Sequence, residues 1–292
     1  MKALQSLIKL LEKIDVVMCT YNSNAPHFDA VLRGISEEVP VHCFILIDRF
    51  SADGTVNKVL EVFPKAKVIL SEENLGKARK KGIDNVDTSL FAFIDDDVLV
   101  LKGWYNYARR TLNDGIGAVA SFAKSCGKLN RGIHYNVIRP HVVISSRNNI
   151  ESQRGWTFAT LIKKEAVAAW KPEEVVAAGE DHEILRHVVR NGFLWVTSYF
   201  VFAEHFDPVQ SYFAFYRNIW RKGAWNAAGL RHIKLVNLHP YKLISQTISK
   251  FLIGIKISFM FRNAFVIPYY FVDSFAFFYG YVCWKKKLFL HR

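Results

Sequence analysis

The sequence contains few cysteines, and they are not grouped. The four lie far apart and lack the paired spacing of a zinc site; they are Cys19, Cys43, Cys126 and Cys283. Disulfide frameworks are typical of secreted chains much smaller than this one of 292 residues. The simplest interpretation is a protein of a reducing compartment.

An uninterrupted apolar stretch is also missing from the N-terminus. Residues 1–16, MKALQSLIKLLEKIDV, are broken by Lys9, Glu12 and Lys13, so they offer no continuous core for a signal peptide. We expect a short amphipathic helix there. Internal repeats and low-complexity linkers are absent, and a hydrophobic content of 51% excludes a disordered chain. The length allows one large domain or two.

Acidic residues are scarce near the C-terminus. Residues 241–292 contain eight Lys or Arg and a single acid, Asp273, so they carry +7 of the net charge of +13. A basic excess indicates nucleic acid or an anionic membrane as a partner. The same segment is the most aromatic and apolar part of the chain, which favours a membrane surface. We expect no nucleic-acid partner.

Short apolar runs rich in β-formers alternate with helical stretches from Ile14 to about His205. This rhythm is typical of a mainly parallel sheet flanked by helices. The expected strands are residues 14–20, 41–48, 66–72, 90–96 and 116–121, and the expected helices are residues 28–38, 55–63, 75–86 and 104–114. Ligands of such sheets bind beyond the carboxyl ends of the strands.

Three consecutive acids, Asp95, Asp96 and Asp97, follow one of these strands. Ordinary turn chemistry explains single polar residues after strands, but not three adjacent carboxylates, which repel one another unless a cation or proton relieves them. Clustered carboxylates suit Mg²⁺ or Mn²⁺, and these ions share their ligand shell with substrate phosphates. The triplet therefore predicts a metal and a diphosphate.

Five segments, taken in order, resemble the inverting family 2 glycosyltransferases with the GT-A fold. They are TYN at 20–22, IDRFSADGT at 47–55, NLGKARKKGI at 74–83, the D-x-D pair Asp95 and Asp97, and GEDHEIL at 179–185. Each segment alone is a weak signal, but their order and their places at strand ends are fairly specific. The resemblance implies a Rossmann-like GT-A catalytic domain, which we expect over residues 1–240. The composition of residues 241–292 predicts a helical membrane-attachment region there.

The resemblance also implies roles for residues. Mn²⁺ or Mg²⁺ would be held by Asp97 and Asp95, with His205 as a further ligand that some members use. Asp181 would be the general base that deprotonates an acceptor hydroxyl, and Glu180 would orient its loop. The matched residues that would bind the nucleotide sugar are Thr20, Tyr21, Asn22, Asp48, Asn74, Gly76, Lys77, Arg79, Asp95 and Asp96. Alternatively, His205 is structural and residues 179–185 only begin a helix.

Two departures from the family pattern matter. Arg49 and Phe50 stand where the family has Asp and Gly, which leaves the nucleoside contacts open. The Q-x-x-R-W motif of processive members is missing, since residues 216–225 read YRNIWRKGAW. We therefore expect transfer of a single sugar.

The C-terminal residues suggest membrane attachment. Residues 241–261 place their polar side chains near one helical stripe, as an interfacial helix does. Residues 264–284 are long enough to span a bilayer, but they contain Pro268 and Asp273 and are rich in Phe and Tyr. Attachment in the membrane plane, on the cytoplasmic face, is favoured over a span. A helical subdomain packed on the core is the alternative.

The expected function is metal-dependent, inverting transfer of one sugar from a UDP- or GDP-linked donor to a hydroxyl of a lipid-linked or surface glycan. Polyprenyl-phosphate sugar synthesis is the nearest alternative, but an ionised phosphate acceptor needs no base such as Asp181. A sugar-nucleotide nucleotidyltransferase normally has a Gly-rich basic loop where this chain has TYNSNAPH. A non-catalytic membrane or nucleic-acid binding protein would leave the ordered acids unexplained.

Overall fold

The structure, a computed structural model, describes residues 12–126, 142–150, 153, 155–172, 179–206, 211–232, 239–262, 264 and 266–283. The chain divides into two compact units. The first comprises residues 1–124, 140–172 and 181–206, and the second comprises residues 125–139, 173–180 and 207–292. The long last segment of the second unit thus begins at residue 207, whereas the sequence suggested a boundary at residue 240. Most of the expected N-terminal helix lies outside the described residues.

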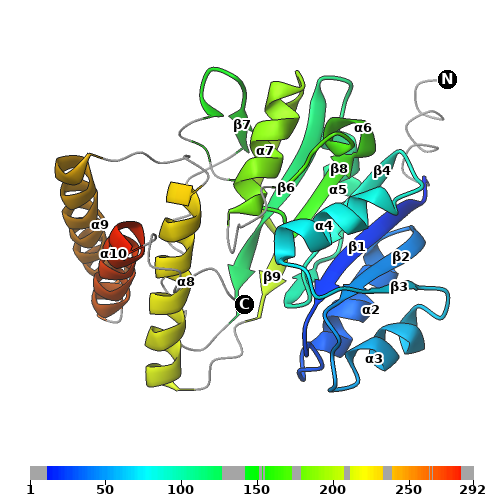
Figure 1. The fold of residues 1–292 in the computed structure, drawn as a ribbon, viewed down its shortest axis with the longest axis horizontal. Helices are drawn as coiled ribbons and strands as arrows, with labels where there is room; N and C mark the ends of the chain where they lie inside the picture. The colour runs from blue at the N-terminus through cyan, green and yellow to red at the C-terminus, as the bar shows by residue number, and fades with distance from the viewer. Residues whose placement is uncertain are drawn as a thin grey trace. The chain divides into compact units, whose positions relative to one another are not determined.

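One mixed sheet forms the centre of the first unit (Figure 1). Its strand order is β3-β2-β1-β4-β8-β6-β9-β5, and β7 also pairs with β9. The four parallel strands are β1 (Ile14–Thr20), β2 (Val41–Asp48), β3 (Lys67–Leu70) and β4 (Leu90–Ile94). Strands with antiparallel neighbours are β5 (Val98–Val100), β6 (Ile116–Ser125), β7 (Val142–Ser145), β8 (Ala159–Lys163) and β9 (Leu194–His205).

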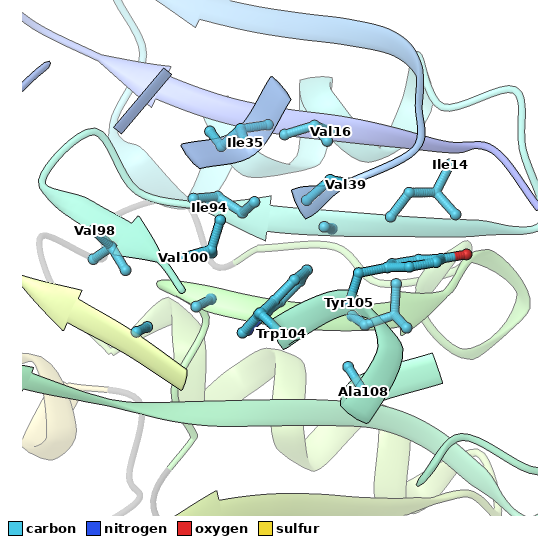
Figure 2. Packing of buried hydrophobic residues seen from close by; sticks show 14 of the residues in the cluster. Ile14, Val16, Ile35, Val39, Ile94, Val98, Val100, Trp104, Tyr105 and Ala108 are labelled. Atoms are coloured by element: carbon cyan, nitrogen blue, oxygen red, sulfur yellow. The ribbon is translucent and has the colours of Figure 1, made fainter. Parts of the chain in front are cut away.

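Alternating side chains of the strands are buried in two separate clusters, one on each face of the sheet. On one face, Val16 and Met18 of β1 pack with residues of α2 (Phe28–Glu38), α3 (Thr55–Val62) and α5 (Trp104–Thr111). Figure 2 shows part of this cluster, including Ile35 of α2 and Trp104 of α5. On the other face, Val17 packs with residues of α4 (Leu75–Asp84), α6 (Lys164–Val167) and α7 (Glu180–Arg190). Because successive side chains of β1 point to opposite faces of the sheet, this strand contributes to both clusters.

The expected elements of the parallel half agree closely with the observed ones. β1, β2 and α2 have the bounds predicted from the sequence, and β6 begins at residue 116 as predicted. Strands β5, β7 and β8 were not predicted. They have three to five residues each, and a short apolar run does not reveal its pairing partner. The pairing within the antiparallel half of the sheet is therefore known only from the structure.

Helices α8 (Tyr212–His232), α9 (Pro240–Phe261) and α10 (Val266–Cys283) make up most of the described second unit. α10 packs against both α8 and α9. The contacts are close, because a Cβ added to Gly254 would lie 2.4 Å from Cβ of Tyr270 and one added to Gly280 would lie 2.0 Å from the Ala224 carbonyl oxygen. Among the described residues of both units, no helix is long and apolar enough to cross a bilayer.

Candidate active site

The carboxyl ends of β1 and β2 are joined through a buried carboxylate. Because the two strands are parallel, Thr20 and Asp48 are paired at the same edge of the sheet. The Thr20 hydroxyl donates to Asp48 Oδ1 at 2.7 Å, and Ser51 donates its amide to Oδ2 at 2.8 Å and its hydroxyl to Oδ1 at 2.6 Å. Asp48 is fully buried. Its carboxylate therefore binds the loop that follows β2 to the end of β1.

The loops after β1 and β2 brace each other further along. The Asn22 amide donates to Ser51 Oγ at 2.8 Å, and Asn22 Oδ1 accepts from the Ala52 amide at 3.0 Å. The Ser23 amide donates to Thr55 Oγ1 at 2.8 Å. Asn22 adopts a φ of 50°, in the left-handed region that Asn tolerates better than most residues. These hydrogen bonds give the two loops a fixed relative position.

The acid triplet lies in the turn between β4 and β5, at this same edge. Each acid contacts a residue from a different part of the chain. Asp95 Oδ1 lies 3.2 Å from a guanidinium nitrogen of Arg79, and Asp97 Oδ2 lies 3.3 Å from His205 Nε2. Asp96 Oδ2 accepts a hydrogen bond from the Ser23 hydroxyl. The triplet thus connects α4, β9 and the loop after β1.

The charges of its two neighbours act on the carboxyl group of Asp96. Burial raises the pKa of Asp96 to about 7, and the charges of Asp97 and Asp95 act in the same direction, while the bond from Ser23 opposes them. A bound cation would relieve this repulsion. Within the described ranges no group of three or more His, Cys, Asp or Glu side chains is arranged to hold a metal ion. The pair of Asp97 and His205 nevertheless fits an ion that takes its other ligands from water and phosphate oxygens.

Helix α4 carries the other residues predicted to contact the nucleotide sugar. Asn74 caps this helix, since its side chain accepts from the Lys77 amide at 3.0 Å. Gly82 permits close packing, because a Cβ there would lie 2.3 Å from Val17 of β1. Arg79 is buried above the ring of Phe93, so it lies beside the acid triplet. Gly76 is also buried, and Lys77 is partly exposed.

The start of α7 is linked to the triplet through the segment before β8. The Asp95 amide donates to the Phe158 carbonyl at 2.9 Å. Three residues earlier, the Gly155 amide donates to Nδ1 of the buried His182 at 3.1 Å. A Cβ at Gly155 would lie 2.1 Å from the Asp181 carbonyl oxygen, so only glycine fits there. Asp181 is partly exposed at this point, and α7 begins at Glu180 as the helix-start interpretation predicted.

The structure therefore connects most of the candidate residues at one edge of the sheet. Thr20, Asn22 and Asp48 belong to the loop network, and Arg79 and His205 contact the triplet. Three further residues were not identified from the sequence: Ser23, Gly155 and His182. Ser23 lies within the quoted TYNSNAPH segment, but nothing in the sequence pairs it with an acid 73 positions away.

Comparison with known proteins identifies the family. The chain matches the family model "Glycosyl transferase family 2" over residues 15–169, which is more than half of its length. No curated protein sequence is a significant match.

Solved structures with a similar fold have little sequence identity to this chain. S. aureus TarS 1–349 in complex with UDP is 15% identical, with a TM-score of 0.55 over 94% of this chain and 92% of that one. The mannosyltransferase PcManGT from Pyrobaculum calidifontis, in complex with GDP-Man and Mn²⁺, is 16% identical, with a TM-score of 0.57 over 93% and 79%. Likeness at this identity concerns the fold alone. The family match and the α/β architecture together establish that the chain belongs to glycosyltransferase family 2, has the GT-A fold and is a glycosyltransferase.

Proposed function

We propose that this glycosyltransferase moves one sugar from a UDP- or GDP-linked donor to a hydroxyl of a lipid-linked or surface glycan, with inversion at the anomeric carbon. The network that joins Thr20, Asp48, Ser23, the acid triplet and His205 at one sheet edge carries the proposal. TarS with UDP and PcManGT with GDP-Man and Mn²⁺ share the fold and support a nucleotide-sugar donor.

Mn²⁺ or Mg²⁺ is the cofactor that the acid triplet suits. Asp97 and His205 would hold it, with Asp95 as a direct ligand or as a partner of a bound water. The ion would neutralise charge that develops on the diphosphate leaving group. The Arg79 guanidinium donates a hydrogen bond to Asp95, and the Ser23 hydroxyl donates one to Asp96. These contacts support a site that is organised before the donor binds.

Asp181 is the residue best suited to accept the proton of the acceptor hydroxyl. It is partly exposed at the start of α7, and Gly155 and His182 anchor this turn to the segment that also bonds Asp95. A base on the side opposite the leaving group favours direct displacement and therefore inversion. NMR analysis of the anomeric configuration of the product tests this directly. Retention would contradict it.

Polyprenyl-phosphate sugar synthesis is the second candidate. A phosphate acceptor is already ionised, so Asp181 would have no proton to remove. Assays of nucleoside diphosphate release with Mn²⁺ should therefore compare polyprenyl phosphate with hydroxyl-bearing glycolipids. Release stimulated only by the hydroxyl acceptor supports our proposal, whereas release with the phosphate favours the alternative. No release from any sugar nucleotide would contradict both.

The exposed apolar side chains of α9 and α10 support attachment in the membrane plane. We propose that this attachment is on the cytoplasmic side. Ten large apolar side chains on these helices expose between 39% and 78% of their surface: Tyr241, Ile244, Ile248, Leu252, Ile253, Phe259, Phe271, Phe275, Tyr279 and Val282. Asp273, the single acid of residues 241–292, forms an ion pair with Lys250. An apolar face with few acids is typical of helices that lie in the bilayer interface.

Flotation of the full chain with vesicles that contain anionic lipids tests this attachment. We expect binding that weakens with salt, because each Lys or Arg near the surface contributes about 1 kcal/mol. Replacing Ile248 and Leu252 together with Glu should release the protein from the vesicles. The matched control is Leu70→Glu, at an exposed apolar position on β3. Equal flotation of both variants would contradict the proposed attachment.

A further inference from the structure

Two side chains, the exposed Tyr21 and the partly exposed Arg49, face each other at the carboxyl edge of β1 and β2. Tyr21 follows β1, and 61% of its surface is exposed. Arg49 follows β2, and its amide donates to the Thr20 carbonyl at 2.9 Å. The Arg49 guanidinium lies over the Tyr21 ring, 5.6 Å from the ring centre. A cation thus lies over an aromatic ring beside the proposed nucleoside site.

The backbone under this pair is held from both loops. Asn22, next to Tyr21, exchanges hydrogen bonds with Ser51 and Ala52, which lie just beyond Arg49. Tyr21 is tied down as well, since its amide donates to Ser23 Oγ at 3.2 Å. The Tyr21 and Arg49 side chains therefore extend from a braced platform.

The Arg49 side chain offers a base hydrogen-bond donors and no acceptor. Asp48, the acidic neighbour of Arg49, is fully buried, and its two oxygens accept three hydrogen bonds from Thr20 and Ser51. Arg49 has five N–H donors in a rigid fork and no acceptor. A base recognised by this side chain must present two neighbouring acceptors.

Guanine meets this requirement, because its N7 and O6 are adjacent acceptors that an Arg fork binds with two hydrogen bonds. Adenine places a donor beside N7, so the second N–H of the fork would meet another donor. Uracil has an N–H between its two carbonyls, which opposes a donor-only side chain. Cytosine has adjacent acceptors, but its single ring offers less area for stacking on Tyr21.

We propose that Arg49 and Tyr21 make this enzyme select a guanosine diphosphate sugar as its donor. The inference rests on the proposed function, since it assigns the base of the same donor. It also gives a role to Arg49, which departs from the acidic residue that the family pattern has at this position. The diphosphate and ribose are common to all candidate donors, so differences in affinity report on the base.

Isothermal titration of the full chain with GDP, UDP, ADP and CDP, each with Mn²⁺, tests the selection. We expect GDP to bind roughly tenfold or more tightly than the others, the discrimination usual for a bidentate Arg contact. Equal or tighter binding of UDP would overturn the inference while leaving the proposed function intact. Tighter binding of ADP or CDP would overturn the inference and also the UDP- or GDP-linked donor of the proposed function. Absence of binding by all four nucleotides would overturn both.

Arg49→Lys separates the fork from its charge. Lysine keeps the positive charge but presents it as a point, so the ratio of GDP to UDP affinity should fall toward one. The matched control is Arg33→Lys, an exposed arginine on α2, for which the ratio should stay unchanged. Melting temperatures of both variants check that the fold is retained. An unchanged ratio in Arg49→Lys would show that Arg49 does not select the base.

Discussion

A guanidinium nitrogen of Arg79 lies 3.2 Å from Oδ1 of Asp95, and it reaches this carboxylate from the buried face of α4. The arginine side chain is 5% exposed and the aspartate side chain 35% exposed. The guanidinium is therefore shielded from water, whereas the carboxylate still contacts it. Removing the Arg79 guanidinium would leave the negative charge of Asp95 unbalanced beside the charges of Asp96 and Asp97. The pair thus stabilises the triplet as well as the helix that carries Arg79.

Replacement of Arg79 by methionine should destabilise the fold. We expect a loss of about 1–3 kcal/mol in the free energy of unfolding, because a buried charged hydrogen bond is lost and its acceptor remains. Urea unfolding measures this loss. Arg79→Lys, which keeps the charge, should be less affected. Equal stability of wild type and Arg79→Met would mean that the ion pair contributes nothing to the fold.

Replacement of Asp97 by alanine should abolish measurable transfer and the metal-dependent part of nucleotide binding. The fold should survive, because removing one acid relieves the repulsion on Asp96 and Asp95. Activity assays and titrations with GDP and UDP, with and without Mn²⁺, check this prediction. Asp114→Asn, at an exposed turn position, is the control. Full activity of Asp97→Ala, or of the wild type in EDTA, would refute the metal role.

Replacement of Asp181 by asparagine should separate catalysis from donor binding. Turnover should fall by roughly 10²-fold to 10⁴-fold, the usual contribution of a positioned general base. Nucleotide affinity should stay near that of the wild type. If affinity is lost while turnover per bound complex is preserved, Asp181 belongs to the donor site.

Gly155→Ala should disturb the turn that holds Asp181. The added methyl group would meet the Asp181 carbonyl oxygen at 2.1 Å, so the backbone must shift. We expect turnover to fall more than nucleotide affinity, with a loss of stability of about 1–3 kcal/mol, as is typical of overpacking. Gly115→Ala is the control, since its nearest neighbour is 3.7 Å away. Similar turnover of the two variants would exclude this positioning role.

Asp96 should make the stability of the metal-free protein depend on pH. Its pKa is raised from 3.8 in the unfolded chain to about 7 in the fold. Between these values the folded state holds the proton that the unfolded state has lost, so the free energy of unfolding should fall as pH rises. Below both values, and above both, this carboxyl adds no further slope.

Urea unfolding in EDTA at several pH values, for the wild type and for Asp96→Asn, measures this effect. The difference in stability between the two proteins should change between pH 4 and pH 7 and then level off. Asp97→Asn should lower the pKa of Asp96 only in part, because burial is the larger cause. A difference independent of pH would mean that Asp96 titrates as an ordinary exposed carboxyl.

The local pattern of the sequence determined much of the parallel half of the sheet. Residues 14–20 and 41–48 form β1 and β2 with the predicted bounds, because their apolar runs have the length and composition of buried strands. The acid triplet was also recognisable as a candidate site, since three acids that are adjacent in the chain stay close to one another in any fold and repel one another. The order of the five matched segments was sufficient to indicate the family.

Tertiary structure decided which residues meet at the site. The short strand β8 brings Phe158 to Asp95, and pairing of Val98 with His205 brings that histidine to Asp97. The bond between Ser23 and Asp96 joins positions 73 residues apart. Such contacts depend on strand order and register, which are set by packing of the whole sheet and not by local propensity. That is why Ser23, Gly155 and His182 could be recognised only from the folded chain.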